Sequence, residues 1–214
     1  NALAVAKRTG ARVYITAHDV MMVQYGKRME RPAGSHPDYP VTWLQNLRQA
    51  GFRYNPLRNY LIRRYLRHVT LIFAVSHALK DFLEMNGLSN IETVYNGLDM
   101  SVETQQAADE GFLNRLGLIG KKVLFLGGRI SHAKGVYASI DAIVGIKNKI
   151  SDVVLFFAGV SDDEKKKIEA YAEKLGVKDL IKVAGWLSKE EMINAYAASN
   201  LVLVPSLYLD PFPN

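Results

Sequence analysis

The stretch Val123-Leu-Phe-Leu-Gly-Gly-Arg-Ile-Ser-His-Ala-Lys-Gly135 decides the fold of this chain. Its apolar start predicts a buried strand, its two glycines predict a turn, and the apolar spacing after Gly135 predicts a helix. A strand, a glycine turn and a helix start bring Arg129, Lys134 and free backbone N–H groups together. Such a point suits a diphosphate. A basic loop that merely faces solvent explains the same residues, and both interpretations stay open at this stage.

Alternating strands and helices follow this stretch. Two S-x-x-E capping boxes, at 161–164 and 188–191, indicate helix starts. Helices of this length between strands imply right-handed crossovers and a parallel sheet that is covered on both faces. Ligands of such sheets bind beyond the carboxyl ends of the strands, where this chain has glycines, Trp186 and Pro205-Ser206. Apolar runs predict the strands at 123–126, 153–158, 181–184 and 201–204.

The first part of the chain has the same alternation in a less regular form. A helix capped by Asn55, with Pro56 in its first turn, is expected to run to about residue 68. Ser76 caps a shorter helix that ends near Gly87. A long irregular stretch is expected at 20–42, and a polar linker at 101–110. Strands are predicted at 12–17, 70–75 and 91–95.

Composition indicates a soluble globular protein with one large or two small domains. The chain has 214 residues, of which 49% are hydrophobic and 22% are charged. No apolar run is long enough to span a bilayer. Cysteine is absent, which excludes disulfides and thiolate metal sites and favours a cytoplasmic location. The chain begins at Asn1 and stops in a proline-rich loop, so we expect it to be part of a longer protein.

Positive charge is concentrated at the start of the chain. Residues 1–68 contain twelve Lys and Arg against three acids, whereas the whole chain has a net charge of +6. Six arginines between 48 and 67 alternate with aromatic residues. Three explanations are open: a solvated helix face, which we favour, then contact with anionic lipid, then a nucleic-acid surface.

Several familiar sites are missing from the sequence. There is no G-x-G-x-x-G after a strand and no G-x-x-x-x-G-K-[ST], which argues against a nicotinamide or flavin site and against a P-loop. There is also no D-x-D triplet, and the five histidines lack metal-ligand spacing. We therefore expect no bound metal and no cofactor, so that side chains and backbone donors must neutralise a diphosphate.

Four segments together resemble the GT-B glycosyltransferases, in particular glycosyltransferase family 4. They are Val75-Ser76 with its helix, the run Val94-Tyr-Asn-Gly-Leu-Asp99, Gly128-Arg129 with Lys134-Gly135, and Pro205-Ser206 with Asp210-Pro-Phe212. The last segment has aspartate where the family more often has glutamate. The resemblance implies an α/β fold of the GT-B type, with two Rossmann-like parallel-sheet domains, both incomplete in this chain. Residues 1–97 would close the acceptor-side domain, and 98–214 would form most of the donor-binding domain.

The resemblance also implies roles for individual residues. Arg129 and Lys134, with Gly128, would hold the donor diphosphate, and Asp210 would contact hydroxyls of the donor sugar. Backbone amides near Phe212 and Asn214 would lie beside the sugar and phosphate, and His18 would face the reaction centre. A second acid, eight positions after the first in the family, would fall beyond Asn214. Two simpler roles stay open, because Asp210 could cap a helix and His18 could bond a loop carbonyl.

The implied activity is transfer of a sugar from a nucleotide-diphosphate sugar, with retained configuration and without a metal. The expected partners are that donor and a sugar, lipid-linked or small-molecule acceptor, with peripheral contact to an anionic membrane and no nucleic acid. The location would be cytoplasmic or membrane-associated, and the 214-residue chain alone would be inactive. Two alternatives are another GT-B enzyme, such as an epimerase or a phosphorylase, and a non-catalytic basic module that binds nucleic acid or anionic lipid.

Overall fold

The computed structural model describes residues 2–25, 40–97 and 107–208. The chain divides into two compact units, which we call unit 1 (up to residue 98, together with Tyr208) and unit 2 (99–207). Each is described by itself.

Unit 2 is a parallel sheet with the strand order β6-β5-β4-β7. Helices and strands alternate as the sequence predicts. Ser161 and Ser188 cap two of the helices, α7 and α8, and Asp109 caps α5. The elements are α5 (Glu110–Leu116), β4 (Lys122–Leu126), η2 (His132–Lys134), α6 (Val136–Ile146), β5 (Val153–Phe157), α7 (Asp162–Lys174), η3 (Lys178–Leu180), β6 (Ile181–Val183), α8 (Lys189–Ala198) and β7 (Leu201–Val202).

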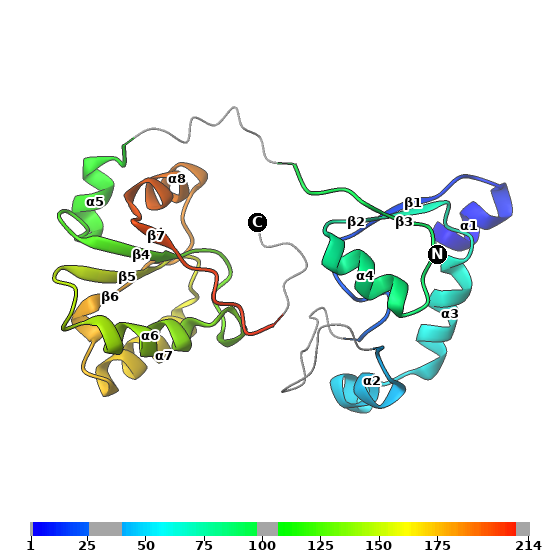
Figure 1. Cartoon of the computed structure of the whole chain (residues 1–214), viewed down its shortest axis with the longest axis horizontal. Coiled ribbons are helices and arrows are strands. Elements are labelled where there is room, and N and C mark those ends of the chain that lie inside the picture. Colours follow the sequence, from blue (N-terminus) through cyan, green and yellow to red (C-terminus); the bar gives the residue numbers. More distant parts are fainter. Residues whose placement is uncertain (1, 26–39, 98–106, 209–214) are drawn as a thin grey trace. The chain divides into compact units, whose positions relative to one another are not determined.

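Helices cover both faces of this sheet, as expected, and Figure 1 shows α5 and α8 on one side of the strands and α6 and α7 on the other. The central strand β5 demonstrates the arrangement, because all five of its residues are buried. Its odd residues Val153, Leu155 and Phe157 enter one core, and its even residues Val154 and Phe156 enter the other. This alternation follows from the two-residue period of a strand.

The direction of the chain reverses once in unit 2. From β4 through β5 to β6, each new strand is added on the same side of the previous one. After β6 the chain returns by α8 and places β7 on the opposite side of β4. A reversal of this kind leaves a crevice at the carboxyl ends of the two strands that flank it. In unit 2 those strands are β4 and β7.

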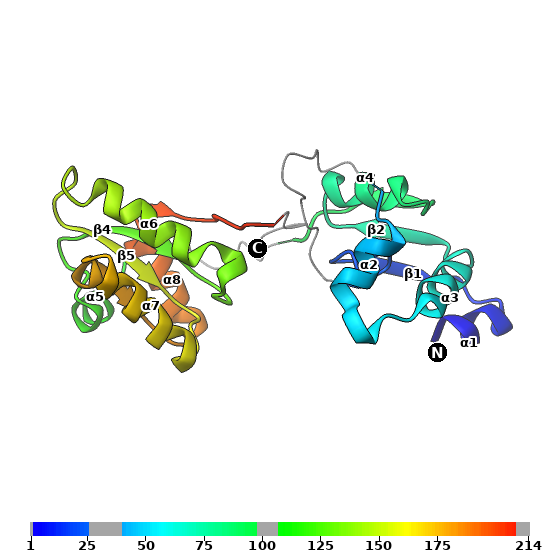
Figure 2. The same cartoon turned by 90° about the horizontal axis from the view of Figure 1, so that it is seen from below.

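Unit 1 is a three-stranded parallel sheet in chain order, β1-β2-β3. Asn55 caps α3, and Pro56 occupies its first position, as the sequence predicts. Helix α1 lies beside α3 in both views (Figures 1 and 2). The elements are α1 (Ala2–Thr9), β1 (Tyr14–Ala17), α2 (Trp43–Ala50), η1 (Gly51–Arg53), α3 (Pro56–Leu66), β2 (Leu71–Ala74), α4 (His77–Met85) and β3 (Ile91–Thr93).

The apolar residues of unit 1 form a single core cluster within the described ranges. Leu66 from α3 and Leu79 from α4 both belong to it, together with Ile72 and Ala74 of β2. Alternate residues on these strands are less buried: Tyr14 is 54% exposed, and its ring stacks on Phe73 at 6.2 Å. Two consecutive right-handed crossovers in one direction place both helices on one face, so the Tyr14 face is left open by the described part of unit 1.

Two local predictions need correction. The capping box at 161–164 forms only in part, because the Ser161 hydroxyl accepts from Glu164 N (3.4 Å) while the Glu164 carboxylate accepts from Lys167 instead. Strand β7 is two residues long, not four, although Leu203 N still donates to Phe125 O of β4 at 2.7 Å. No helix in the described ranges is long and apolar enough to cross a membrane.

Candidate functional site

Two loops of unit 2 meet at the reversal of the sheet. One loop follows β4, and the other follows β7. Gly135 (φ +76°) lies so close to the second loop that an added Cβ would be 2.0 Å from the Pro205 carbonyl oxygen. Leu207 N also donates to Ala133 O at 2.9 Å. Only glycine permits this approach and this backbone conformation together, which explains why glycine follows Lys134.

Neighbouring strand ends are joined in the same way. Gly159 (φ +85°), after β5, would place a Cβ 2.1 Å from the Gly128 carbonyl oxygen. Its own carbonyl accepts from Ile130 N at 3.3 Å, and its N–H donates to Gly185 O at 2.8 Å. The loops after β4, β5 and β6 are therefore held backbone to backbone, which fixes this edge of the sheet without using side chains.

The structure places Arg129 and Lys134 on the loop that follows β4, as the sequence predicts. Arg129 is exposed, and within the described part of the chain it has no hydrogen-bond or ion-pair partner. Lys134 is half-buried and ends η2, one residue before the cap of α6. Gly128 turns the chain ahead of Arg129 with φ +104°. The loop therefore offers one unpaired guanidinium and one more enclosed ammonium.

The start of α6 adds backbone donors to this loop. Its cap is Gly135, whose lack of a side chain leaves the first amides of the helix without a side-chain acceptor. The Ser139 hydroxyl donates to the Gly135 carbonyl at 3.1 Å. On the loop after β7, Ser206 follows Pro205 directly. Its hydroxyl is buried and has no hydrogen-bond partner among the described residues. A buried hydroxyl in this state is costly unless a ligand or water bonds it.

Two aromatic side chains border this loop system. Trp186 follows β6 and is 71% exposed, although tryptophan is usually well covered. Tyr137, in the first turn of α6, lies 5.7 Å from the His132 ring and 5.1 Å from the Tyr171 ring. Burial raises the pKa of Tyr137, and the nearby Glu164 carboxylate raises it further. Tyr137 is therefore a neutral hydrogen-bonding group at physiological pH and not a base.

Unit 1 carries the predicted His18 at the carboxyl end of β1, where its side chain is exposed. The adjacent Asp19 carboxylate accepts from Met21 N at 2.9 Å, so it shapes the turn. A second histidine at the same edge was missed by the sequence reasoning. His77 follows β2, with its Nδ1 3.2 Å from the Thr93 hydroxyl and its ring edge-on to Tyr95 at 5.8 Å. Its position directly after a buried strand is a signal that could have identified it.

Three predicted site residues, Asp210, Phe212 and Asn214, lie outside the described residues. Within the described ranges, no group of three or more His, Asp or Glu is arranged to hold a metal ion.

Two family models match consecutive parts of the chain. The model for glycosyltransferase family 4 matches residues 1–102, and the model for glycosyl transferases group 1 matches residues 115–214. Between them they leave only the 103–114 segment unmatched.

Curated relatives match over part of the chain. Spore coat protein SA of Bacillus subtilis is 27% identical over 135 residues, which are 58% of this chain and 36% of that protein. D-inositol 3-phosphate glycosyltransferase of Xylanimonas cellulosilytica is 25% identical over 144 residues, 64% of this chain and 34% of that protein. The matched regions thus cover about a third of each relative.

Solved structures match almost the whole chain. Anabaena HepE in complex with UDP and glucose aligns with a TM-score of 0.67 and 20% identity over 99% of this chain and 51% of that one. Sucrose-phosphate synthase from Thermosynechococcus elongatus aligns with a TM-score of 0.69 and 16% identity, over 99% of this chain and 48% of that one. The chain spans about half the length of these proteins, and at such identities the likeness concerns the fold.

Proposed function

We propose that this chain, a GT-B glycosyltransferase that resembles family 4, is part of an enzyme that moves a sugar from a nucleotide-diphosphate sugar to an acceptor. The observation that carries the proposal is the junction of the β4 and β7 loops, where Gly135 packs against Pro205. That junction lies at the reversal of the sheet, on the loop that carries Arg129 and Lys134 and leads into α6. Residues 98–214 would serve the donor, and residues 1–97 the acceptor.

Charge explains how such a loop assists the reaction. Breaking the sugar–phosphate bond leaves a growing negative charge on the diphosphate oxygens. Fixed cations and N–H groups aimed at those oxygens bind the transition state more tightly than the ground state. A hydrogen bond to a charged group contributes about 1.5–3 kcal/mol, whereas a helix start contributes about 0.3–1 kcal/mol. Arg129 and Lys134 should therefore matter more than α6 itself.

The buried Ser206 hydroxyl fits the same ligand. It lacks a protein partner among the described residues, and a phosphate or sugar oxygen would satisfy it. The base of the nucleotide needs a different surface, for which we propose the exposed ring of Trp186. Stacking of a base on an aromatic ring contributes about 1–3 kcal/mol. UDP is the nucleotide in the HepE complex, which makes it the first donor nucleotide to test.

Finer features of the reaction are also proposals. We propose that side chains and amides, and not a metal, neutralise the charge of the diphosphate. We expect the transfer to retain the configuration of the sugar. Asp210 would contact the sugar hydroxyls, and His18 would face the reaction centre. Phe212 and Asn214 would add backbone amides. The acceptor is unassigned. The 214-residue chain alone is proposed to bind nucleotide without transferring sugar.

Calorimetric titration with UDP and GDP tests the proposal directly. Arg129→Ala should weaken nucleotide binding at least about tenfold, from the range for one charge-assisted contact. Lys149→Ala is a matched control, because Lys149 is an exposed cation of the same unit, three residues beyond the far end of α6. Equal affinities of the two variants would remove the assignment of Arg129. A requirement for Mg²⁺, tested by adding EDTA, would contradict the metal-free part.

A further inference from the structure

Unit 1 contains the same reactive dipeptide twice. Asn-Gly occurs at Asn86-Gly87 and at Asn96-Gly97, and nowhere else in the chain. In this dipeptide the backbone nitrogen of the glycine can attack the side-chain amide carbon of the asparagine, because glycine has no Cβ to hinder the approach. Both pairs have the same reacting atoms, so their surroundings in the fold decide which of them reacts.

The first pair is held in an unreactive state. Asn86 caps the end of α4 and is 6% exposed. Its Oδ1 accepts from Val41 N at 2.7 Å, and its Nδ2 donates to Phe82 O at 2.8 Å. The attacking atom is occupied as well, because Gly87 N donates to Glu84 O at 2.9 Å. Both reacting groups of this pair are therefore fixed by hydrogen bonds.

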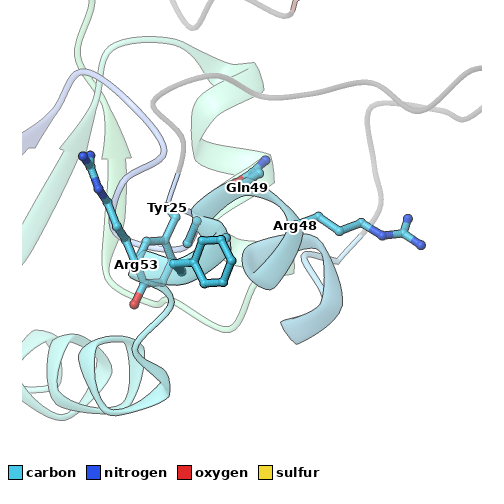
Figure 3. Close-up of a pocket in the computed structure, with 7 residues that line it drawn as sticks. Tyr25, Arg48, Gln49 and Arg53 are labelled. Carbon is cyan, nitrogen blue, oxygen red and sulfur yellow. The ribbon is translucent and has the colours of Figure 1, made fainter.

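The backbone that bonds to Asn86 is itself anchored. Val41 lies just before α2, and Asn46 attaches that helix by accepting from Tyr25 N at 3.0 Å. Figure 3 shows Tyr25 beside the end of α2, where it lines one cavity with residues 48–53. A group that is enclosed in this way reacts only when the structure around it opens locally.

The second pair has a different environment. Asn96-Gly97 follows β3 and ends the described range 40–97. Gly97 is exposed, and its N–H has no hydrogen-bond acceptor among the described residues. The Asn96 side chain is half-buried, in contrast to the enclosed Asn86. A Cβ added at Gly97 would meet nothing within 4 Å. The attacking nitrogen of this pair is therefore accessible, and there is open space beside it.

We propose that Asn96 is a site of spontaneous deamidation in the folded protein and that Asn86 is not. The Gly97 nitrogen forms a bond to Cγ of Asn96, the Cγ–Nδ2 bond breaks, and ammonia leaves with the proton of the backbone amide. Water then opens the resulting five-membered succinimide at one of its two carbonyl groups. The product is aspartate or isoaspartate, and the reaction needs no oxidant, reductant or enzyme.

The reaction changes both the charge and the main chain just before residue 98, where unit 1 ends along the sequence. A carboxylate replaces a neutral amide on a chain of net charge +6, and the isoaspartyl form adds one CH₂ group to the backbone. Position 96 directly follows Tyr95, whose ring lies edge-on to His77 at 5.8 Å. Ageing of the protein therefore produces charge variants that differ at the carboxyl edge of the unit 1 sheet.

Peptide mass analysis of the whole chain during incubation at pH 8 tests the inference. One sample stays folded and a second is held in urea, and both are followed until half of Asn86 has converted in urea. In urea the two pairs should convert at similar rates. In the folded chain Asn96 should convert at least about tenfold faster than Asn86, the factor that the opening of two hydrogen bonds represents. Equal rates in the folded chain, or a folded chain in which Asn96 stays intact, would overturn the proposal.

Gly97→Ala is the matched variant. Position 97 has open space and no positive φ, so alanine fits without strain and the urea unfolding curve should be unchanged. The added methyl group hinders the attack, so the conversion of Asn96 should slow in the folded and the unfolded chain alike. Undiminished conversion would show that water releases the ammonia directly, without the Gly97 nitrogen, and would overturn the proposed reaction.

The pH dependence gives a second readout. The rate at Asn96 should rise from pH 6 to pH 8, because the attacking group is the deprotonated amide nitrogen. A rate that does not change over this range would contradict attack by that nitrogen. The inference does not use the nucleotide site, so a failed UDP titration would reject the proposed function and leave this inference standing.

Discussion

The two parallel sheets of this protein bury different numbers of faces. Unit 2 packs helices on both sides of its sheet and has two apolar cores, whereas the described part of unit 1 has a single core cluster, formed with α3 and α4. The cause is the direction in which strands are added. Unit 2 reverses direction at β4 and β7, whereas the strands of unit 1 follow in chain order.

The comparison teaches that the reversal adds α8 to the second core, beside α5, and brings the loops after β4 and β7 together. A crossover in the opposite direction puts α8 on the face that α6 and α7 leave open, and the loops after β4 and β7 meet at the point of reversal. The helices show the contrast at the level of residues, because α6 buries Val136, Ile140 and Ile143 while α2 buries Asn46. Unit 2 is therefore organised by apolar packing, and the α2 region of unit 1 is held by polar contacts.

The largest expected effect breaks the junction that the reversal creates. Gly135→Ala should destabilise unit 2 by about 3 kcal/mol, since a positive φ costs roughly 1–2 kcal/mol and overpacking costs about 1–3 kcal/mol. Gly120→Ala is the control, because Gly120 also has a positive φ (+69°) but open space around it. Urea unfolding followed by fluorescence measures both. Equal losses would mean that the contact with Pro205 contributes nothing.

A polar contact of unit 1 gives the next effect. Asn46→Ala should cost about 2 kcal/mol, because it leaves the Tyr25 N–H and the Val23 carbonyl without their partner. Leu44→Ala, two residues earlier in α2 and 42% exposed, should change stability by less than about 0.5 kcal/mol. Thermal unfolding of the two variants decides the matter. A larger cost for Leu44→Ala would show that α2 is held by apolar packing after all.

The caps of α7 and α8, which cover opposite faces of the unit 2 sheet, give a smaller expected effect on stability. Ser188→Ala should cost about 1 kcal/mol, because the Ser188 hydroxyl and the Glu191 carboxylate complete a reciprocal box at the start of α8. Ser161→Ala should cost about half as much, since its bond to Glu164 N is long and unreciprocated. The difference in melting temperature between the two variants is the measurement. The reverse ranking would contradict the assignment of the caps.

The smallest effect is a dependence on pH. The bond from Ser188 N and then the Arg115 guanidinium lower the pKa of Glu191 below its ordinary value of 4.5. A carboxyl group with a lowered pKa stabilises the folded state above that ordinary value and loses this contribution as the pH falls. Stability measured from pH 6 down to 3 should therefore decrease less steeply in Glu191→Gln. An unchanged slope would show that the link between α5 and α8 through Arg115 has no effect on stability.

Local features were predictable because they depend on neighbouring residues. The spacing of Val136, Ile140 and Ile143 predicted the buried face of α6, and Asn55 with Pro56 predicted the start of α3. Long-range features were not predictable. Asn46 is buried because Val23 and Tyr25, more than twenty residues earlier, bond to it, and the capping box at 161–164 is incomplete because Lys167 takes the Glu164 carboxylate.

The candidate site likewise has features that could be predicted from the sequence and features that could not. The residues of the loop after β4, with their charges and glycines, are legible in the sequence as a phosphate-binding set. Nothing in the sequence shows that Pro205 meets Gly135, or that His77 lies beside Thr93 and Tyr95. These contacts join residues from different strands, so they depend on the order of the strands in the sheet.

The amino-acid sequence by itself determined the strands, the helices α3, α4, α6, α7 and α8, and the loop that carries fixed positive charge, since propensity, periodicity and capping act over a few residues. Helices α2 and α5 were not predicted. The tertiary structure alone decided that β7 returns beside β4 and that the loops after β4 and β7 meet at Gly135. It also decided that Trp43 of α2 and Phe52 of the turn after α2 are exposed. Such outcomes follow from competition among packings of distant segments, in which no single segment contains the answer.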